Sequence, residues 1–567
     1  MKKIYLLVLV TLAIAGCQKD SAISSDKLYL SVEGMRGGEK LAVEGAVSYW
    51  ASGDRVRINE EVLTVSIDES AGTAVATSSG TGFSSPYRGV YPSSIYSGNS
   101  DKEHYTLNLP ANYTYATTTH YGRTLQNLQA PMVAYTNEGT NLKFKHVTGA
   151  VAVQVVNYYG FTIEVDSIVV TSTVSEDNAY NLCGMTAVTL SNGDPVVNAN
   201  RVGVDSTKSV KMKFNGTDHL QIFAGDSAVV QIPVLPVGDG NKFNVLVGVH
   251  KVDQSAVKKN FVRTQTTGGA MPRAKMGYAR FTTGGLFTIN SSGKKVIISQ
   301  GNLQYQASTG TWQFAKEQYT SIRNAVGNNN FTGTRSEQAD WIDLFGWGTS
   351  GWNNGNTDTM PYNNYYNTTG ETYGYGYGPR KGYSVYYSLI GDYAHADWGV
   401  HNPISNGGGK AEMWYTLPGG AGPGWDYLMS TRSASTINGK ENARFTKSLV
   451  AGINGIIIFP DEYTHPSDVT LPDAAGINAT GSDTWNGNNY SEDAWSKMEA
   501  EGAVFLPITG RTANSLVEYA GYGYYWSSTY SSNKNAYYYN FNGVSISIKN
   551  GFARYFGCAV RLVHDVN

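Results

Sequence analysis

The 567-residue sequence predicts a mainly β protein, in which two β-sandwiches in tandem are followed by an α+β domain. Three observations carry this prediction. Apolar and polar residues alternate over short runs in the first half of the chain, which is typical of strands with one buried face. Gly, Tyr, Ser, Thr and Asn are abundant, as they are in turns and strands. Ten of the eleven tryptophans follow residue 285, which marks a domain of different composition.

The charge and cysteine content exclude several classes of protein. The chain carries 43 Lys and Arg against 45 Asp and Glu, a net charge of −2, so it lacks the strongly basic character of nucleic-acid-binding proteins. Its hydrophobic fraction of 41% excludes a wholly disordered chain. Three cysteines exclude a disulfide-dense scaffold and a cysteine-rich zinc site. We expect Cys183 and Cys558 to be buried and unpaired.

Residues 1–16 have the pattern of a secretory signal peptide. A basic start, Met1–Lys3, precedes the apolar run Ile4–Ala15, which is shorter than the roughly 20 residues that span a bilayer. The end of this run, Leu12–Cys17, resembles the lipobox of bacterial lipoproteins. The resemblance implies cleavage before Cys17, lipidation of Cys17 with palmitate-like acyl chains, and an outer-membrane anchor. An ordinary signal peptide with an incidental Cys17 is the alternative.

From Lys27 to about Phe281 the pattern is that of strands, without a convincing helix. Apolar residues alternate along Leu28–Glu33, Val151–Val156 and Val245–Val249, separated by Gly, Asn, Asp and Ser. So many short strands favour two sandwiches. We place a lipidated N-terminal segment at 17–36, the first sandwich at 37–157 and the second at 158–284.

Five stretches of this region resemble the fimbrillins, the pilus subunits of the type V system. They are Tyr49–Val56, Tyr87–Pro92, Leu107–Pro110, Pro131–Tyr135 and Phe144–Ala150. The resemblance implies two fimbrillin-like sandwiches in a subunit that is exported as a lipoprotein and trimmed by an Arg-specific protease. A strand from the next subunit then fills the opened groove, which is β-augmentation. Fimbrillin subunits are therefore the implied partners, and His146 is expected to be a core histidine.

The trimming site is predicted at Arg36. Leu28–Glu33 is a candidate removable strand, and Gly37–Gly38 after Arg36 supplies the extended backbone that a protease needs. The alternative keeps this segment as a permanent edge strand with Arg36 in solvent. The sequence leaves both interpretations open.

The region 285–567 combines two short helices with strands and long loops. The helices are predicted at Trp425–Arg432 and at Ser491–Gly502, where Ser491 caps the start and Gly502 stops the end. Val296–Ile298, Gly455–Pro460 and Ala503–Pro507 are candidate buried strands, and the longest loop runs from Asn354 to Ser388. These elements predict an α+β domain.

This region resembles the C-type-lectin-like fold, in the branch of formylglycine-generating and major paralogous domains. The resemblance lies in Gly301–Tyr305, Trp312–Ala315, Trp341–Gly348, Phe505–Pro507, Tyr524–Thr529 and Ala559–Val563. It implies a ligand-binding domain in which the tryptophans are mostly core residues. Cys558 stands alone where the formylglycine-generating relatives use two cysteines, and the calcium-lectin motif is reduced to Trp485–Gly487.

No catalytic motif is present: the sequence has no Gly-x-Ser-x-Gly elbow, no HExxH and no P-loop. We therefore predict no enzyme activity, no cofactor and no metal site.

The tail is a candidate ligand-binding surface. Tyr522–Phe556 has 35 residues, of which eight are Tyr, six Ser and five Asn, a composition like that of antibody binding loops. Ser545, Ser547 and Lys549 alternate with Val544, Ile546 and Ile548, which predicts one displayed and one buried face. The tail also resembles the variable regions of diversity-generating retroelements. The candidate ligand-binding residues are Asn533, Asn535, Tyr538, Asn540, Asn542, Ser545, Ser547, Asn550, Phe552, Tyr555, Phe556 and, from a neighbouring loop, Trp352. An ordinary pair of Tyr-rich strands is the alternative.

Together these features predict the tip adhesin of a pilus, or fimbrium. A chain that ends in a globular domain is expected to accept a strand and donate none. The expected locations are the outer membrane before assembly and the cell surface or fimbrium afterwards. A host or bacterial surface glycan or protein is the expected ligand, and nucleic acid is not. The alternative is a monomeric surface lipoprotein that captures glycans, or a surface enzyme of the formylglycine-generating type.

Overall fold

The computed structural model describes residues 27–566 with internal gaps. The gaps are 34–35, 38–49, 69–72, 81, 100, 102, 121–122, 174–178, 199–206, 307, 322–340, 353–386, 482–484, 514–515, 533–534 and 555. The predicted signal peptide and Cys17 therefore lie outside the described residues. Within the described part, no helix is both long and apolar enough to cross a membrane.

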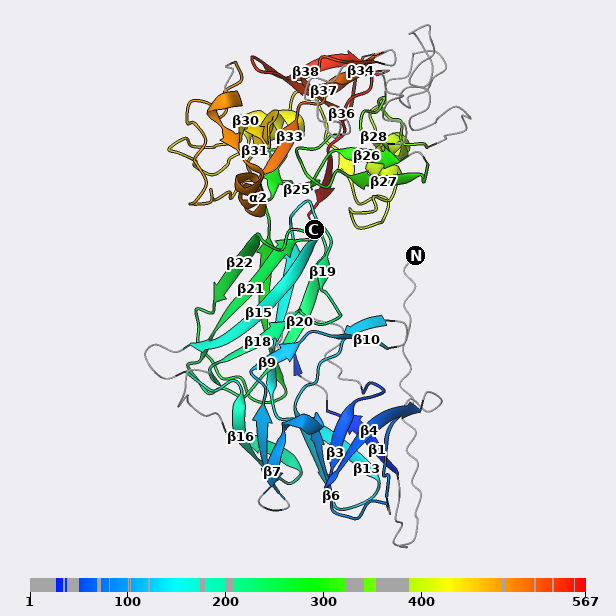
Figure 1. Cartoon of the computed structure of the whole chain (residues 1–567), viewed down its shortest axis with the longest axis vertical. Helices are drawn as coiled ribbons and strands as arrows, with labels where there is room; N and C mark the ends of the chain where they lie inside the picture. The colour runs from blue at the N-terminus through cyan, green and yellow to red at the C-terminus, as the bar shows by residue number, and fades with distance from the viewer. Residues whose placement is uncertain are drawn as a thin grey trace.

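Three β-rich bodies follow one another along the long axis of the molecule (Figure 1). We call them the barrel, the middle unit and the head. The barrel lies at one end and the head, which contains the C-terminal half of the chain, lies at the other. The prediction of a mainly β fold is confirmed.

The barrel is closed by seven strands in the order β1-β13-β12-β6-β3-β4-β5. Their bounds are β1 Lys27–Val32, β3 Arg55–Ile58, β4 Glu61–Asp68, β5 Thr73–Thr77, β6 Tyr87–Tyr91, β12 Met132–Thr136 and β13 Asn141–His146; the short helix η1, Ser93–Ile95, follows β6. Trp50 lies in the core with its ring centroid 5.0 Å from those of Tyr91 and Phe144. His146 is fully buried, as predicted, and burial lowers its pKa. The first body is thus a closed barrel, where two open sheets were predicted.

The middle unit packs two sheets against one apolar core. One sheet has the order β2 (Arg36–Gly37), β23 (Lys275–Thr283), β14 (Gly149–Asn157) and β20 (Ser227–Val234). The other has the order β22 (Lys258–Thr264), β21 (Lys242–Lys251), β15 (Ile163–Thr173), β18 (Ser209–Lys213) and β9 (Asn112–Thr114), and β19 (Gln221–Ile222) also pairs with β15. Alternate valines of β14 and β21 point into the shared core.

Smaller sheets complete the first half of the chain. They are β17 (Asp194–Val197), β16 (Gly184–Ser191), β8 (His104–Leu109) and β7 (Tyr96–Asn99) in one sheet, and β10 (Thr117–His120) with β11 (Arg123–Gln126) in a hairpin. Cys183 is buried in the middle-unit core and Cys558 in the head core, and neither forms a disulfide bond.

The strands do not separate at residue 157, where the sequence suggested a boundary. β14 comes before that residue, yet it pairs along its length with β20 and, in parallel, with β23. β8 pairs likewise with β16, and β9 with β18. Alternation along a strand reports which face is buried but carries no information on which distant strand pairs with it. The two β regions therefore exchange strands and are not separate in sequence. β1, which was predicted to lie in a separate N-terminal segment, is one of the strands of the barrel.

The head is built from five small sheets around buried tryptophans. Their strands are β24 (Phe287–Thr288), β25 (Lys295–Ile298), β39 (Leu562–Asp565) and β29 (Tyr415–Thr416); β27 (Thr311–Phe314), β26 (Leu303–Gln306) and β28 (Trp341–Ile342); β32 (Asn489–Tyr490), β30 (Phe445–Val450), β31 (Ile453–Ile458) and β33 (Val504–Pro507); β34 (Arg511–Ala513) and β35 (Leu516–Glu518); and β36 (Gly523–Ser532), β37 (Asn535–Phe541) and β38 (Ile546–Ala553). Six tryptophan side chains are fully buried: Trp347, Trp398, Trp414, Trp425, Trp495 and Trp526. The prediction that tryptophans form the core is therefore confirmed for these six.

The helices of the head are short. They are η5 (Gly391–Ala396), α1 (Trp398–His401), η6 (Tyr427–Thr431), η7 (Trp485–Gly487) and α2 (Glu492–Ala500). Helix α2 confirms the predicted helix, and the Ser491 side chain caps it by accepting a hydrogen bond from the Ala494 N–H at 3.2 Å. The other predicted helix, Trp425–Arg432, is a single π-helical turn over η6.

Candidate ligand-binding surface of the head

The predicted binding tail forms a three-stranded antiparallel sheet, which we call the tip sheet, at the end of the molecule remote from the barrel (Figure 1). Its strands are β36, β37 and β38, with β37 in the centre. The pairing of β37 with β38 shifts register between Tyr538 and Asn540. A bulge of this kind re-aims the side chains that follow it. Tyr538 and Tyr539 are consequently both buried, in different parts of the head core.

Two predicted ligand contacts are core residues, so the prediction is wrong for them. Tyr538 is 8% exposed, and its ring centroid lies 4.8 Å from that of Phe552. Asn542 is 9% exposed, and its Oδ1 accepts hydrogen bonds from the Val544 N–H at 2.9 Å and the Ser545 N–H at 2.7 Å. Tyr538 is buried on the same face of β37 as Ala536, and the Asn542 side chain stabilises the turn between β37 and β38. Neither side chain is available as a ligand anchor.

The remaining candidates have mixed positions. Ser545 is exposed in the turn, and Val544, which the alternation placed inside, is 63% exposed because it precedes β38. Half-buried candidates are Asn535, Asn540, Ser547, Phe552 and Phe556. Asn550 lies on β38, where only its backbone is described, and Asn533 and Tyr555 lie outside the described residues.

An arginine organises the aromatic residues next to the tip sheet. The guanidinium carbon of Arg511, on β34, lies 4.2 Å from the ring centroid of Phe556, 4.7 Å from that of Phe552 and 4.4 Å from that of Tyr519. Such contacts hold a cation over aromatic faces. Tyr519 is 52% exposed, so this cluster presents an aromatic ring to solvent. Sequence reasoning missed Arg511 and Tyr519, because only the folded hairpin β34-β35 brings them to Phe552 and Phe556.

A second aromatic group, which we call the aromatic strip, flanks β36. It consists of Tyr387, Tyr393, Trp352 and His395. Tyr387 stacks on Tyr393 with ring centroids 4.1 Å apart, and Trp352 lies 6.4 Å from Tyr393 and 6.0 Å from His395. Tyr387 is 40% exposed and His395 is exposed. Trp352, which we predicted as a ligand contact from a neighbouring loop, thus lies in this aromatic group.

Two hydrogen bonds hold the segment of the aromatic strip against the tip sheet. The Leu389 N–H donates to the Ser528 carbonyl at 2.7 Å, and the Tyr530 N–H donates to the Ser388 hydroxyl at 3.4 Å. At the other end of the strip, the ring centroids of His395 and His401 lie 5.9 Å apart. Burial, and then the charge of His395, lower the pKa of His401. His401, beside the strip, is therefore disposed to stay uncharged at neutral pH.

The described side chains give no sign of metal chemistry. In the ranges that the structure describes, no group of three or more His, Cys, Asp and Glu side chains is arranged to hold an ion. The described side chains of this surface present exposed aromatic rings together with a few hydroxyl and amide groups. Such a surface suits recognition by contact area and adaptable hydrogen bonds.

Comparison with known proteins gives similarity at low identity. No family model matches the sequence, and no curated protein matches it. Among solved structures, a candidate cell adhesion protein from Bacteroides ovatus ATCC 8483 is 12% identical with a TM-score of 0.27, covering 45% of this chain and 91% of its own. One from Bacteroides fragilis NCTC 9343 is 12% identical with a TM-score of 0.25, covering 52% and 99%. A fimbrial protein from Bacteroides ovatus ATCC 8483 is 12% identical with a TM-score of 0.22, covering 95% and 99%. At these values the likenesses assign neither a family nor a function to this chain.

Proposed function

We propose that this protein is a cell-surface adhesin of a pilus, which joins the fibre through its barrel and binds a ligand through its head. The position of β1 carries the proposal. β1 lies between β5, with which it is antiparallel, and β13, with which it is parallel. Its inward side chains Leu28 and Leu30 are 0% and 6% exposed. The first strand of the described chain thus closes the barrel between β5 and β13.

Removal of β1 would create a site for another strand. The facing edges of β5 and β13 would lose their hydrogen-bond partners, and the space left by Leu28 and Leu30 would form an apolar groove. A sheet edge of this kind accepts an extended segment with alternating apolar residues. A donor strand from a second pilus subunit has that chemistry.

Arg36 fits the role of the trimming site by its place in the sheet. It lies in β2, whose backbone pairs with Lys275 and Met276 at the edge of the middle-unit sheet. Cleavage after Arg36 would separate β1, which belongs to the barrel, from the rest of the chain. An ion pair of 2.7 Å between Glu33 and Arg273 would have to break as the segment leaves.

The remaining parts of the proposal concern anchoring and the ligand. Cys17 would carry the lipid that holds the precursor on the outer membrane before assembly at the cell surface. The head would bind a surface glycan or protein, without catalysis, through the tip sheet, the Arg511 cluster and the aromatic strip. Variation along the tail by a retroelement would alter exposed positions such as Ser545.

Limited digestion of the full-length protein with an arginine-specific protease tests the assembly step. We expect a major cut after Arg36, which gives a product that begins at Gly37 in mass spectrometry. The product should then bind a synthetic peptide with alternating apolar residues. The Arg36→Gln variant is the matched control and should resist both the cut and the peptide. Assembled pili whose subunits retain an intact N-terminal segment through Lys40 would contradict the proposal.

A further inference from the structure

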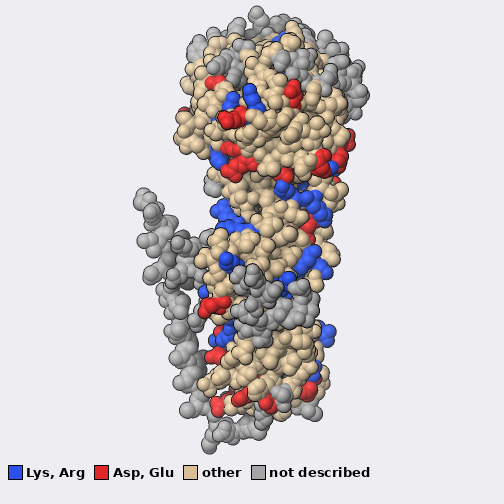
Figure 2. Space-filling model, turned by 90° about the vertical axis from the view of Figure 1, so that its left-hand side faces the viewer, with Lys and Arg blue, Asp and Glu red and all other residues tan. Residues whose placement is uncertain are grey.

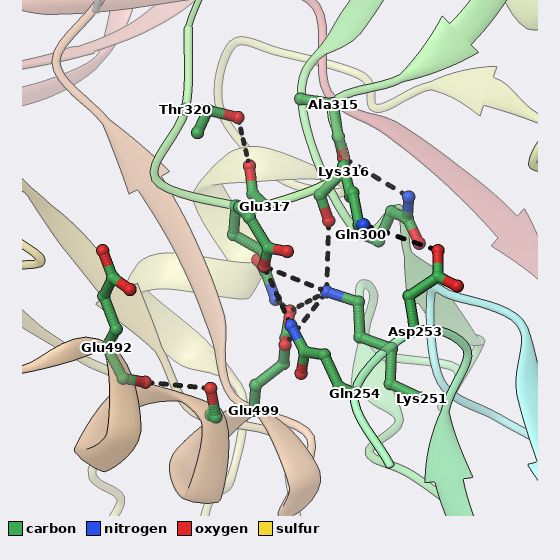
Figure 3. Close-up of polar contacts among 12 residues, drawn as sticks. Lys251, Asp253, Gln254, Gln300, Ala315, Lys316, Glu317, Thr320, Glu492 and Glu499 are labelled. Carbon is green, nitrogen blue, oxygen red and sulfur yellow. Dashed lines mark hydrogen bonds and ion pairs between the residues drawn. The ribbon is translucent and has the colours of Figure 1, made fainter. Parts of the chain in front are cut away.

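A buried ion pair joins the head to the middle unit. Lys251, at the end of β21, places its Nζ 3.2 Å and 3.1 Å from the two carboxylate oxygens of Glu499 on α2 (Figure 3). The side chains are 7% and 2% exposed. Two opposite charges this far from water are costly unless each is fully satisfied by partners. Whether the neighbouring groups satisfy both charges therefore decides whether this pair stabilises the junction.

The surrounding groups satisfy the pair. Lys251 also donates to the Lys316 carbonyl at 3.1 Å and lies 3.5 Å from the Glu317 carboxylate. On the other side, the Gln318 amide donates to Glu499 at 2.9 Å. Figure 3 shows Lys316, Glu317 and Glu499, all from the head, around the lysine at the end of β21. The two charges are thus held in one geometry by several hydrogen bonds at the buried junction, whereas an exposed salt bridge on the surface lacks such support.

The same network continues into the head as far as the tip sheet. The oxygen of the Gln318 amide accepts a hydrogen bond from Arg561, which is fully buried. Arg561 also donates to Asn302 at 3.1 Å, and Asn302 donates to the Tyr525 hydroxyl at 3.3 Å. Tyr525 belongs to β36. Hydrogen bonds therefore run without a break from the middle unit to a strand of the candidate ligand-binding surface.

Close backbone contacts reinforce the junction. The Gln300 N–H donates to the Gly160 carbonyl at 2.8 Å, and the Tyr159 hydroxyl donates to the Ala500 carbonyl at 2.5 Å. A Cβ at Gly160 would lie 1.8 Å from the Ile298 carbonyl oxygen, so only glycine fits there. Lys259 pairs with Glu501 across the same boundary. Figure 2 shows the wider pattern, with acidic side chains on the edge of the head and basic side chains on the adjoining surface of the middle unit.

We infer that the head and the middle unit form one rigid body, in which the Lys251–Glu499 pair and its network fix the direction of the ligand-binding surface along the long axis. A hinge motion at the junction would separate the pair and leave a buried charge without its partner. The head consequently cannot swing freely on a linker. This inference concerns the joint itself and holds for any ligand that the head binds.

Distance measurements between spin labels test rigidity in the full-length chain. The labels replace Val262 on β22 and Val544 at the tip, which are 59% and 63% exposed, in a protein that carries Cys17→Ser. Cys183 and Cys558 are buried and stay unlabelled. We expect one narrow distance distribution. A broad or bimodal distribution in the unaltered joint would overturn the inference.

Variants at the pair provide the second test. Lys251→Met should broaden the distribution and lower the melting temperature by about 5 °C, because Glu499 loses its partner. The double variant Lys251→Met with Glu499→Met should restore both, since an apolar pair removes the stranded charge. Lys316→Met is the control, because its partner Asp253 lies 3.4 Å away in an exposed pair and should contribute little. If Lys251→Met fails to fold, recovery in the double variant still supports the inference. A single variant indistinguishable from the control would contradict it.

Discussion

Asp397 shows how one buried carboxyl supports the aromatic strip. It is fully buried, and its side chain caps the first turn of α1 by accepting a hydrogen bond from the Gly399 N–H at 3.1 Å. Its other oxygen accepts from the Thr416 N–H on β29 at 2.8 Å. Burial raises its pKa from 3.8 to about 6, although these hydrogen bonds act to lower it. Asp397 thus links α1 to β29, and the burial of its carboxyl group disfavours the charged form.

This shift makes a prediction about pH. In the unfolded chain the Asp397 carboxyl ionises near 3.8 and in the folded chain near 6, so the folded state holds the proton more tightly between these values. Its contribution to stability is therefore greatest below about pH 4 and falls by about 3 kcal/mol as the pH rises to about 7. Asp397→Asn should lose that part of the pH dependence. Urea unfolding of both proteins at about pH 4 and pH 7 measures the difference, and equal pH dependence in the two would contradict it.

At the scale of elements, the turn between β37 and β38 holds the edge of the tip sheet in place. Asn542 accepts hydrogen bonds from two backbone N–H groups and from the Ser545 hydroxyl at 3.0 Å. The next carbonyl, that of Gly543, accepts from Lys447 on β30 at 2.7 Å. Side-chain oxygens that satisfy backbone donors in a turn of this kind define its shape.

Asn542→Ala should therefore destabilise the head by about 1–3 kcal/mol, because three hydrogen bonds of the turn lose their acceptor. The adjacent Val544→Ala is a suitable control, since Val544 is 63% exposed and its truncation should change stability by less than about 0.5 kcal/mol. Chemical denaturation of the two variants beside the parent protein gives the comparison. If Asn542→Ala proves as mild as the control, the hydrogen bonds of the turn contribute little.

Elements also show what could be predicted from the sequence. Local alternation predicts β1, β14 and β21, and the Ser491 cap predicts α2, because each signal lies within a few residues of its element. The parallel pairing of β14 with β23 and the closure of the barrel by β1 depend on contacts between distant segments. In the candidate site too, one part could be predicted from the local sequence and another part could not. Its Tyr-rich composition identified the tip sheet, but a one-residue bulge decided which tyrosines are buried.

At the scale of the whole molecule, the two proposed activities lie at opposite ends. β1 is in the barrel, and the tip sheet lies at the far end of the head (Figure 1). Between them, the middle unit shares strands with the first part of the chain and an ion-paired joint with the head. Strand exchange in the barrel would therefore leave the ligand-binding surface intact. If the protein acts as proposed, tension on a bound ligand would pass through the β-sheets and the joint to the fibre.

This separation allows ligand binding to be tested without disturbing assembly. Tyr519 and Tyr387 present exposed rings from the Arg511 cluster and the aromatic strip, 52% and 40% exposed. Exposed aromatic residues are common among the few that dominate binding energy, and loss of one costs about 2 kcal/mol or more, roughly a 30-fold fall in affinity. We expect Tyr519→Ala or Tyr387→Ala to weaken binding to that extent for a ligand found by screening glycans and surface proteins with the full-length protein.

Val262→Ala is the matched control for these variants, because Val262 is 59% exposed but lies on β22 of the middle unit. Melting curves must show that each variant keeps its fold, since Tyr519 also packs on Arg511 and Tyr387 on Tyr393. The Arg36→Gln protein should bind the same ligand as the parent protein, because Arg36 lies at the edge of the middle-unit sheet and not in the head. Unchanged affinity in both tyrosine variants, with the fold intact, would place the binding site on another part of the head.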